Sequence, residues 1–298
     1  MAIMPPLLQA GDTIGIICPS HIADREKSRH FTTVLESLGF RVRLGDNIYR
    51  DTYGYSATEQ ERAEDLNRMV EDDTVKMVLF GGGEGGNELL PYIDFDSIAK
   101  HPKLFCGFSD STTILNAVHS RSGIVTHYGQ GPGMFYDLQD YDYAHFAAHF
   151  LTGNAAIFHK GSDWECFGTG SSTGILLGGY LRNIALMLGN DYLRYDADKK
   201  YLLFLEDHEK FNNVPAVSSY LSHIEQHPFI EQVAGLVWGH YAPARNPDLL
   251  RRLERFADRH KVPVAYCDDF GHGALHGILP IGREATLDAA SQILTFLA

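Results

Sequence analysis

The sequence predicts an α/β protein with a mostly parallel sheet. Short apolar runs, typical of buried strands, alternate with longer helical patterns in the first hundred residues and again in the C-terminal half. Glycine-rich or polar turns follow several of these apolar runs. Strand–helix–strand units of this kind place their strands parallel, with helices on both faces of the sheet.

The N-terminal half supplies the first of these units. We expect Gly39 to end a helix and Ser56 to cap the next one, with Glu59 at the capping-box position. The strands are expected at 13–19, 40–44, 75–80 and 104–106. The helices are expected at 28–38, 56–72 and 87–90.

The C-terminal half repeats the alternation after a polar, glycine-rich stretch at 152–173, which we interpret as a linker. The predicted domains are therefore 1–151 and 174–298. Helices are expected at 178–188, 218–227 and 247–260. Strands are expected at 201–206, 233–238 and 262–266.

Composition limits the possible partners. The 298 residues are 44% hydrophobic and 21% charged, which is ordinary for a globular protein with its own core. The net charge of -13 repels phosphate backbones, so we expect no nucleic-acid partner. We also expect a cytoplasmic protein without a membrane anchor, because no apolar run approaches about 20 residues and no secretory signal is visible. The four cysteines are widely spaced, which is typical of reduced thiols.

A glycine run at 81–86 follows a predicted strand, where a phosphate-binding loop would lie. It lacks the lysine of a P-loop, and it fits the dinucleotide pattern G-x-G-x-x-G only with Glu84 where the pyrophosphate would bind. Glycines also let backbone N–H groups approach an anion closely, so we favour an oxyanion-binding loop. A plain flexible turn remains the alternative.

The stretch Gly107–Ser111 (GFSDS) is similar to the nucleophile elbow G-x-S-x-G, with serine in place of the last glycine. Such a strand-to-helix turn exposes the Ser109 hydroxyl and points the Asp110 N–H at a developing oxyanion. The alternative is that Ser109 only caps a helix. Cys106 is a rival nucleophile, but its apolar surroundings are expected to keep the thiol protonated.

A serine nucleophile needs a base and a carboxylate that orients it. Glu206 ends an apolar strand, and His272 stands between two glycines after another strand, with His208 and His276 as further candidate bases. For each of these residues, the alternative is a position in a solvated surface loop without a catalytic role. A metal site is a further alternative, because Asp268, Asp269, His272 and His276 have ligand chemistry at short spacing.

Six segments in order resemble those of one family: LQAGDTIGIICPS, GG with LLPYIDFD, KLFCGFSDSTT, GIVTHYG, LFLED, and GHG with LPIG. They are similar to segments of the LD-carboxypeptidase family of serine peptidases, which includes the microcin C immunity carboxypeptidases. The resemblance implies a flavodoxin-like N-terminal domain, a C-terminal α/β domain, a homodimer, and no metal or other cofactor.

The resemblance also implies a role for each matching residue. Ser109 would be the nucleophile, Glu206 the acid and His272 the base, and the oxyanion would be bound by the N–H groups of Gly83 and Asp110. The implied reaction is release of terminal D-Ala from murein-derived L,D-tetrapeptides, as in peptidoglycan recycling.

Two other functions remain open. One is a microcin-type immunity peptidase that cleaves peptidyl or aminoacyl nucleotides, whose base Trp164 could stack on. The glycine loop ends in GNELL, which is closer to that branch, and it lacks the RGGYG of murein-recycling members. The other is a non-catalytic α/β module that binds an anion at this loop.

Overall fold

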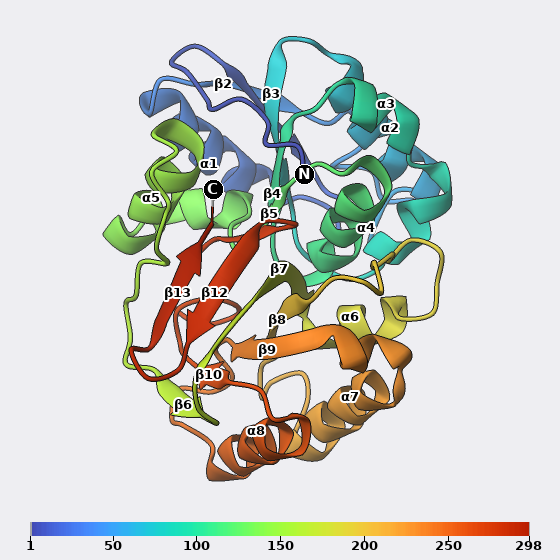
Figure 1. Cartoon of the computed structure of the whole chain (residues 1–298). Helices are drawn as coiled ribbons and strands as arrows, with labels where there is room; N and C mark the ends of the chain where they lie inside the picture. Colours follow the sequence, from blue (N-terminus) through green and yellow to red (C-terminus); the bar gives the residue numbers. More distant parts are fainter. Residues whose placement is uncertain (1, 298) are drawn as a thin grey trace. The chain divides into compact units, whose positions relative to one another are not determined.

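The structure, a computed structural model, describes residues 2–297. The chain forms two compact units, divided between Asn154 and Ala155. Each unit has its own sheet and its own helices (Figure 1). The expected two-domain α/β architecture is therefore confirmed.

The N-terminal unit contains a parallel sheet in the strand order β2-β1-β3-β4-β5. This is the flavodoxin-like order that the family resemblance implies, and it places the strand-order reversal between β1 and β3. Its strands are β1 (Thr13–Ile17), β2 (Arg41–Leu44), β3 (Val75–Phe80), β4 (Leu104–Gly107) and β5 (Thr126–Tyr128).

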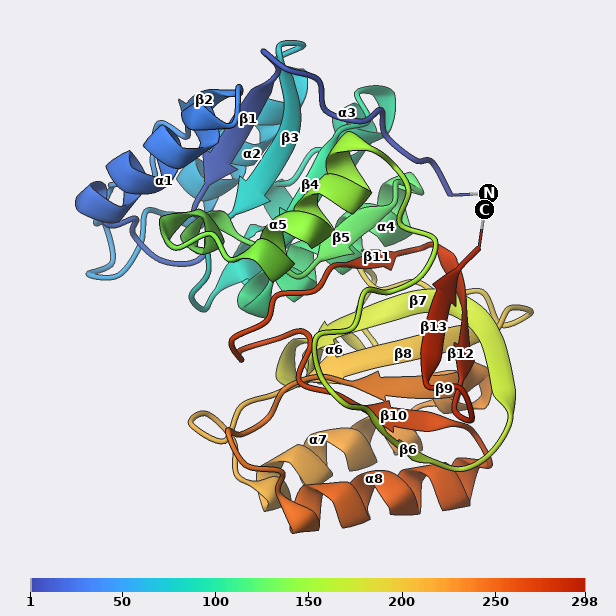
Figure 2. The same cartoon turned by 90° about the vertical axis from the view of Figure 1, so that its left-hand side faces the viewer.

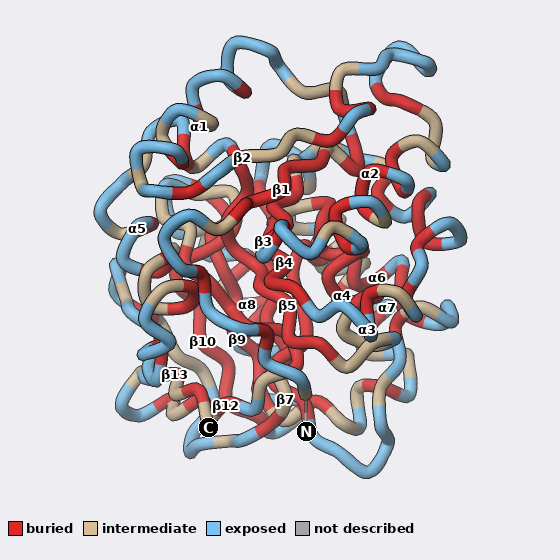
Figure 3. The backbone as a smooth tube through the Cα atoms, turned by 90° about the horizontal axis from the view of Figure 1, so that it is seen from above, coloured by how far each residue is buried: buried red, intermediate tan, exposed pale blue. Residues whose placement is uncertain are grey.

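Helices cover both faces of this sheet. Helices α1 and α5 lie on one face, and α2, α3 and α4 lie on the other (Figures 1 and 2). The central strands are therefore buried almost throughout, which is why they are continuous apolar runs (Figure 3). The α-helices are α1 (Arg25–Ser37), α2 (Glu59–Glu71), α3 (Phe95–Lys100), α4 (Thr112–Ser122) and α5 (Asp140–Phe146). Shorter helical segments are η1 (Gly86–Tyr92), η2 (Ser109–Ser111), η3 (Pro132–Tyr136) and the π-helical η4 (Ala147–Leu151).

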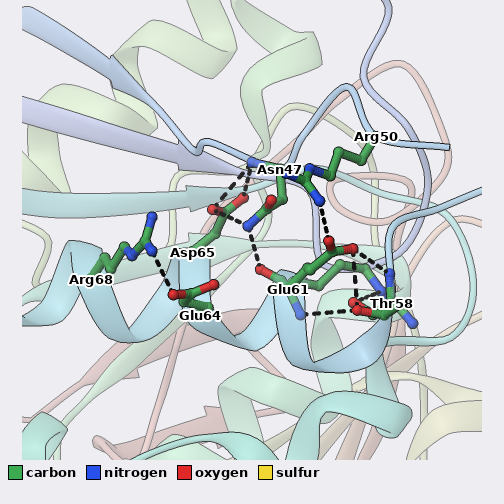
Figure 4. Close-up of polar contacts among 8 residues, drawn as sticks. Asn47, Arg50, Thr58, Glu61, Glu64, Asp65 and Arg68 are labelled. Carbon is green, nitrogen blue, oxygen red and sulfur yellow. Dashed lines mark hydrogen bonds and ion pairs between the residues drawn. The ribbon is translucent and has the colours of Figure 1, made fainter. Parts of the chain in front are cut away.

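The start of α2 corrects one prediction. Thr58, and not Ser56, caps the helix: its hydroxyl accepts the N–H of Glu61, and the Glu61 carboxylate accepts the N–H of Thr58 (Figure 4). Ser56 and Glu59 have the same spacing, but Ser56 is buried and Glu59 accepts a hydrogen bond from the Tyr53 hydroxyl. Two capping boxes overlap in the sequence, and these tertiary contacts select the later one.

The C-terminal unit contains a mixed sheet in the order β13-β12-β7-β8-β9-β10-β6. Strands β7 to β10 are parallel, whereas β6, β12 and β13 pair antiparallel. Its strands are β6 (Glu165–Phe167), β7 (Ser171–Tyr180), β8 (Tyr201–Glu206), β9 (Val233–Trp238), β10 (Val264–Tyr266), β12 (Glu284–Asp288) and β13 (Ile293–Phe296), and the unit also carries β11 (Leu279–Ile281).

Helices α7 (Val214–Gln226) and α8 (Pro247–His260) lie on one face of the parallel strands, with α6 (Leu181–Met187) packed against α7 (Figures 1 and 2). A short helical segment, η5 (Pro228–Gln232), leads into β9. No helix within residues 2–297 is long and apolar enough to cross a membrane.

Strand β7 differs from the sequence prediction. Residues 178–180 were expected to begin a helix, but they continue the strand, and α6 starts at Leu181. Gly178 has a φ of +155°, and a Cβ there would lie 1.8 Å from the Phe204 carbonyl oxygen. Glycine thus allows β7 and β8 to approach closely at this point. The expected linker at 152–173 contains β6 and the first residues of β7.

Candidate active site

Ser109 lies two residues after the end of β4 and has a φ of +59°, which is strained for a residue other than glycine. Gly107, two residues earlier, has no room for a side chain, because a Cβ would lie 2.7 Å from the Ser111 Cβ and 2.9 Å from the Phe80 Cβ. A short helical turn and then α4 continue from Ser109. This strained strand-to-helix turn has the geometry of a nucleophile elbow.

Hydrogen bonds fix the backbone on both sides of Ser109. Its N–H donates to the hydroxyl of Tyr128, 3.0 Å away at the end of the neighbouring strand β5. Its carbonyl accepts the Thr112 hydroxyl at 2.6 Å. Tyr128 is fully buried, so the turn is held by a rigid part of the core. Tyr128 was not among the predicted site residues, although the motif GIVTHYG contains it.

The Asp110 side chain connects three loops at the carboxyl ends of β1, β3 and β4. Its Oδ2 accepts the Ser20 hydroxyl at 2.5 Å and the Gly86 N–H at 2.6 Å, and the residue is 4% exposed. Ser20 follows β1 and Gly86 closes the glycine run after β3. Asp110 therefore positions the glycine loop against the elbow. The sequence predicted a role for its N–H and missed the role of its carboxylate.

Gly83 has a φ of +134°, and a Cβ there would lie 2.6 Å from His21 Cγ and 2.9 Å from Ser20 Cβ. The buried guanidinium of Arg62 supports the same loop by donating to the carbonyls of Pro19 and Gly85. These contacts constrain the loop, which favours the interpretation as an oxyanion-binding loop over a plain flexible turn. Arg62 was not predicted, although a charged residue on the apolar face of α2 was a signal for it.

Cys106 cannot compete as a nucleophile. It is fully buried, and burial raises the pKa of its thiol to about 12. The thiol contacts the Gln130 carbonyl oxygen at 3.1 Å. A thiol with this pKa stays protonated near neutral pH, so the interpretation of Cys106 as strand packing is confirmed.

The C-terminal unit brings Glu206 and His272 together. Glu206 is the last residue of β8 and is fully buried, and its Oε2 lies 2.8 Å from His272 Nδ1. Gly271 has a φ of +100°, and a Cβ there would lie 2.8 Å from the same carboxylate oxygen. The glycine before His272 therefore makes room for the pair, as the flanking glycines had suggested.

The surroundings of His272 tune its basicity. Burial lowers the pKa of His272, but the charge of Glu206, the hydrogen bond to it and the charge of Asp207 together outweigh burial and raise the pKa above its usual value. The rings of Tyr180 and Phe211 pack at 5.3 Å and 5.2 Å between centroids. With Nδ1 donating to Glu206, the neutral ring presents Nε2 as a proton acceptor.

Of the two further candidate bases, His208 is less suited to the role than His272. His208 accepts the Lys210 N–H at Nδ1, and burial followed by the positive charge of His240 lowers the pKa of its ring. Its ring lies 6.5 Å from that of His272. For His276, a role as the base stays a prediction.

The acidic residues near His272 have other partners. Asp268 accepts from the Tyr266 hydroxyl and pairs with His240 Nδ1 at 3.0 Å. Asp269 is fully buried and accepts the Trp164 indole N–H at 2.6 Å. Among residues 2–297, no three His, Cys, Asp or Glu side chains are grouped to hold a metal ion. The set Asp268, Asp269, His272 and His276 thus does not form the metal site considered from sequence.

Trp164 has a structural role. Its side chain is 4% exposed and packs beside Phe158, and its indole N–H is used by Asp269. The indole face is therefore not presented for stacking on a nucleobase, which corrects the possibility considered from sequence.

The families of LD-carboxypeptidase N-terminal and C-terminal domains match residues 14–129 and 173–287, respectively. A probable murein peptide carboxypeptidase of Bacillus subtilis (strain 168) is 29% identical, over 97% of this chain and 92% of that protein. The microcin C7 self-immunity protein MccF of Escherichia coli is 26% identical, over 95% of this chain and 93% of that protein.

Solved structures agree with these matches. The crystal structure of an MccF-like protein from Bacillus anthracis (strain Ames) has a TM-score of 0.90 and 25% identity, covering 100% of both chains. A structure of MccF in complex with aspartyl sulfamoyl adenosine has a TM-score of 0.87 and 21% identity over 99% and 98% of the chains, which shows the same fold. The chain therefore belongs to the LD-carboxypeptidase family and is a serine-type carboxypeptidase, not a non-catalytic anion-binding module.

Proposed function

We propose that this enzyme releases the terminal D-Ala of murein-derived L,D-tetrapeptides through an acyl-enzyme formed on Ser109. The observation that carries the proposal is the buried hydrogen bond of 2.8 Å between Glu206 and His272, in a chain that has a strained serine, Ser109, in the turn after β4. A buried carboxylate on one imidazole nitrogen prepares the other nitrogen to accept a proton.

In the first step, Ser109 Oγ attacks the carbonyl carbon of the scissile amide and His272 Nε2 takes the hydroxyl proton. Glu206 stabilises the imidazolium that forms and keeps the ring in one orientation. The tetrahedral intermediate collapses when His272 returns the proton to the nitrogen of D-Ala, which leaves as the free amino acid. Water then attacks the acyl-enzyme, with His272 as general base, and releases the shortened peptide.

The proposed oxyanion hole consists of the N–H groups of Asp110 and Gly83. Asp110 follows the nucleophile at the start of a helical segment, where N–H groups favour negative charge. The conformation of Gly83 excludes a side chain, and the Asp110 carboxylate holds the far end of its loop through Gly86. Each such donor contributes about 3 kcal/mol to transition-state binding in other hydrolases.

Relatives suggest two substrate classes, and sequence identity slightly favours murein peptides: 29% to the B. subtilis protein against 26% to MccF. The buried Trp164 also gives no support to nucleobase stacking. Cleavage of peptidyl or aminoacyl nucleotides is the second candidate, because MccF was solved with aspartyl sulfamoyl adenosine. The homodimer stays a prediction.

The test is release of D-Ala from L-Ala-γ-D-Glu-meso-diaminopimelate-D-Ala by wild type and Ser109→Ala. We expect the variant to lose at least about 10³-fold in kcat, because the acyl-enzyme cannot form. Cys106→Ala is the matched control: it removes the rival nucleophile, which lies three residues before Ser109, and should retain activity.

Equal activity of wild type and Ser109→Ala would refute the role of Ser109. If wild type ignores the tetrapeptide but cleaves aspartyl sulfamoyl adenosine, the substrate assignment moves to the second candidate. Thermal unfolding of each variant shows whether a loss of activity reflects a loss of structure.

A further inference from the structure

A pocket in the N-terminal unit is lined by none of the proposed catalytic residues. Its volume is about 560 Å³, and it is lined by Tyr53, Tyr55, Glu59, Glu88, Pro91 and Tyr92. The three tyrosines are 49%, 43% and 41% exposed, which is high for large aromatic side chains. We call this the tyrosine pocket.

The lining of the tyrosine pocket suits a cation. It combines three aromatic rings, whose faces are electron-rich, with two carboxylates, and it contains no lysine or arginine. The rings of Tyr53 and Tyr55 are 6.3 Å apart and inclined by 33°, so they form an open angle and not a closed stack. Anionic groups would be repelled there, and a purely apolar ligand would leave the carboxylates desolvated.

The two carboxylates contribute differently. Glu88 pairs with the buried Arg62 guanidinium, which neutralises most of its charge. Glu59 instead accepts a neutral donor, the Tyr53 hydroxyl, at 3.0 Å through Oε2. Glu59 therefore gives the pocket its negative charge.

The tyrosine pocket adjoins the glycine loop. The ring of Tyr55 packs edge-to-face on His21 at 5.8 Å, and His21 is the residue that a Gly83 side chain would strike. A Cβ on Gly85 would lie 3.4 Å from Glu88 Oε2. His21 is thus next to both the tyrosine pocket, through Tyr55, and the proposed oxyanion donor Gly83.

We infer that the tyrosine pocket binds a primary ammonium group of the peptide substrate, an inference that rests on the proposed function. The lining contains no lysine or arginine that could pair with a carboxylate of the ligand. The pocket therefore favours an ammonium group that has no carboxylate beside it. That condition selects the amino terminus of the peptide over the zwitterionic end of meso-diaminopimelate. The amino terminus lies three residues before the scissile bond, roughly 10 Å when extended, and so beyond the groups at the reaction centre.

The kinetic test uses Glu59→Gln, which removes the charge but keeps an oxygen for Tyr53. We expect KM for the tetrapeptide to rise about fivefold, with a smaller change in kcat. Wild type should show a similar rise in KM for the N-acetylated tetrapeptide, and the variant should not distinguish the two peptides. Glu64→Gln is the matched control, because it removes an exposed carboxylate from the same helix outside the pocket.

The kinetic measurements identify which ammonium group of the peptide is bound. If KM responds to loss of the diaminopimelate amine but not to N-acetylation, the assignment to the amino terminus is wrong. If KM rises as much in Glu64→Gln as in Glu59→Gln, the proposed binding in the tyrosine pocket is wrong, because the loss of one negative charge anywhere on the surface would then explain the rise in KM. A change of oligomeric state in Glu59→Gln, seen by light scattering, would also overturn it by making this face an interface between copies.

A binding experiment separates this inference from the proposed function. Saturation-transfer NMR with n-butylammonium needs no turnover, and n-butanol serves as the neutral probe of similar shape. We expect transfer to n-butylammonium that is lost in Glu59→Gln, with little transfer to n-butanol. Equal transfer to both probes would refute the cation site, even if the enzyme releases D-Ala. Selective binding of n-butylammonium would support the cation site, even if the enzyme releases no D-Ala.

Discussion

Replacing Glu206 by glutamine tests the carboxylate–histidine pair most directly. Glutamine has nearly the same shape and keeps an oxygen that can accept the His272 Nδ1–H, so packing around Gly271 should survive. The substitution removes the negative charge that stabilises protonated His272. It also permits the amide NH₂ to donate to Nδ1, which would place the ring proton on Nε2.

The magnitude follows from the geometry. Glu206 is fully buried and 2.8 Å from Nδ1, so water screens the pair little. Opposite charges about 4 Å apart interact by about 4 kcal/mol at an effective dielectric constant of about 20. Loss of that energy in the transition state lowers kcat about 10³-fold. The wrong tautomer cannot accept the Ser109 proton, and the equivalent change in another serine hydrolase costs about 10⁴-fold, so we expect a loss between these values.

The same change alters how stability depends on pH. The pKa of His272 is raised in the folded enzyme, so its stabilising contribution is fully present below the unfolded value of about 6.5 and is lost as pH rises through the folded pKa. Without the Glu206 charge, burial dominates and lowers the pKa of His272. The stability deficit of Glu206→Gln should therefore be larger at about pH 5.5 than at about pH 8.5.

The assays are D-Ala release at about pH 8, urea denaturation at both pH values, and NMR titration of the His272 imidazole. Asp268→Asn is the matched control, because it removes the carboxylate from a second carboxylate–histidine pair, that of His240, and should change kcat only a few-fold. A kcat for Glu206→Gln within about tenfold of wild type would refute the catalytic reasoning. An unchanged His272 pKa would refute the electrostatic part.

Two further predictions concern Gly83 and Trp164, which are closely packed against their neighbours. Gly83→Ala should lower kcat about 10²- to 10³-fold with a smaller effect on KM, because its Cβ would lie 2.6 Å from His21 Cγ and displace the proposed oxyanion donor. Gly82→Ala, whose Cβ meets nothing within 4 Å, is the control, and equal losses in both variants would contradict the assignment. Trp164→Phe should lower the free energy of unfolding by about 1–3 kcal/mol, because buried Asp269 loses a donor, while kcat changes only a few-fold. Unchanged urea stability together with a large loss of activity would show that Trp164 acts on substrate.

Local patterns were sufficient for elements whose ends are marked in the sequence. Strand β9 and helix α8 have the predicted bounds, Val233–Trp238 and Pro247–His260. Asn246 caps α8 and Pro247 occupies its first turn, so the start of the helix is determined by neighbouring residues. Where two local signals overlapped, as at Thr58 and Ser56, the sequence favoured the wrong one.

Contacts between distant residues explain what the sequence did not reveal. The Asp110 carboxylate binds Ser20, 90 positions away, and Arg62 reaches Pro19, 43 positions away. The strand conformation of Gly178 depends on the Phe204 carbonyl of the neighbouring strand. No periodicity or cap encodes such pairings, because they exist only once strands and helices have packed.

The candidate site divides in the same way. The turn after β4, the carboxylate that ends β8 and the glycines around His272 are local features, and the sequence therefore identified Ser109, Glu206 and His272 as candidates. The 2.8 Å contact joins residues 66 positions apart, and it requires a burial site for Glu206 and a backbone at Gly271 that a Cβ would obstruct. Chain folding alone supplies these conditions, since burial and the direction of a side chain are set by neighbours that are remote in sequence.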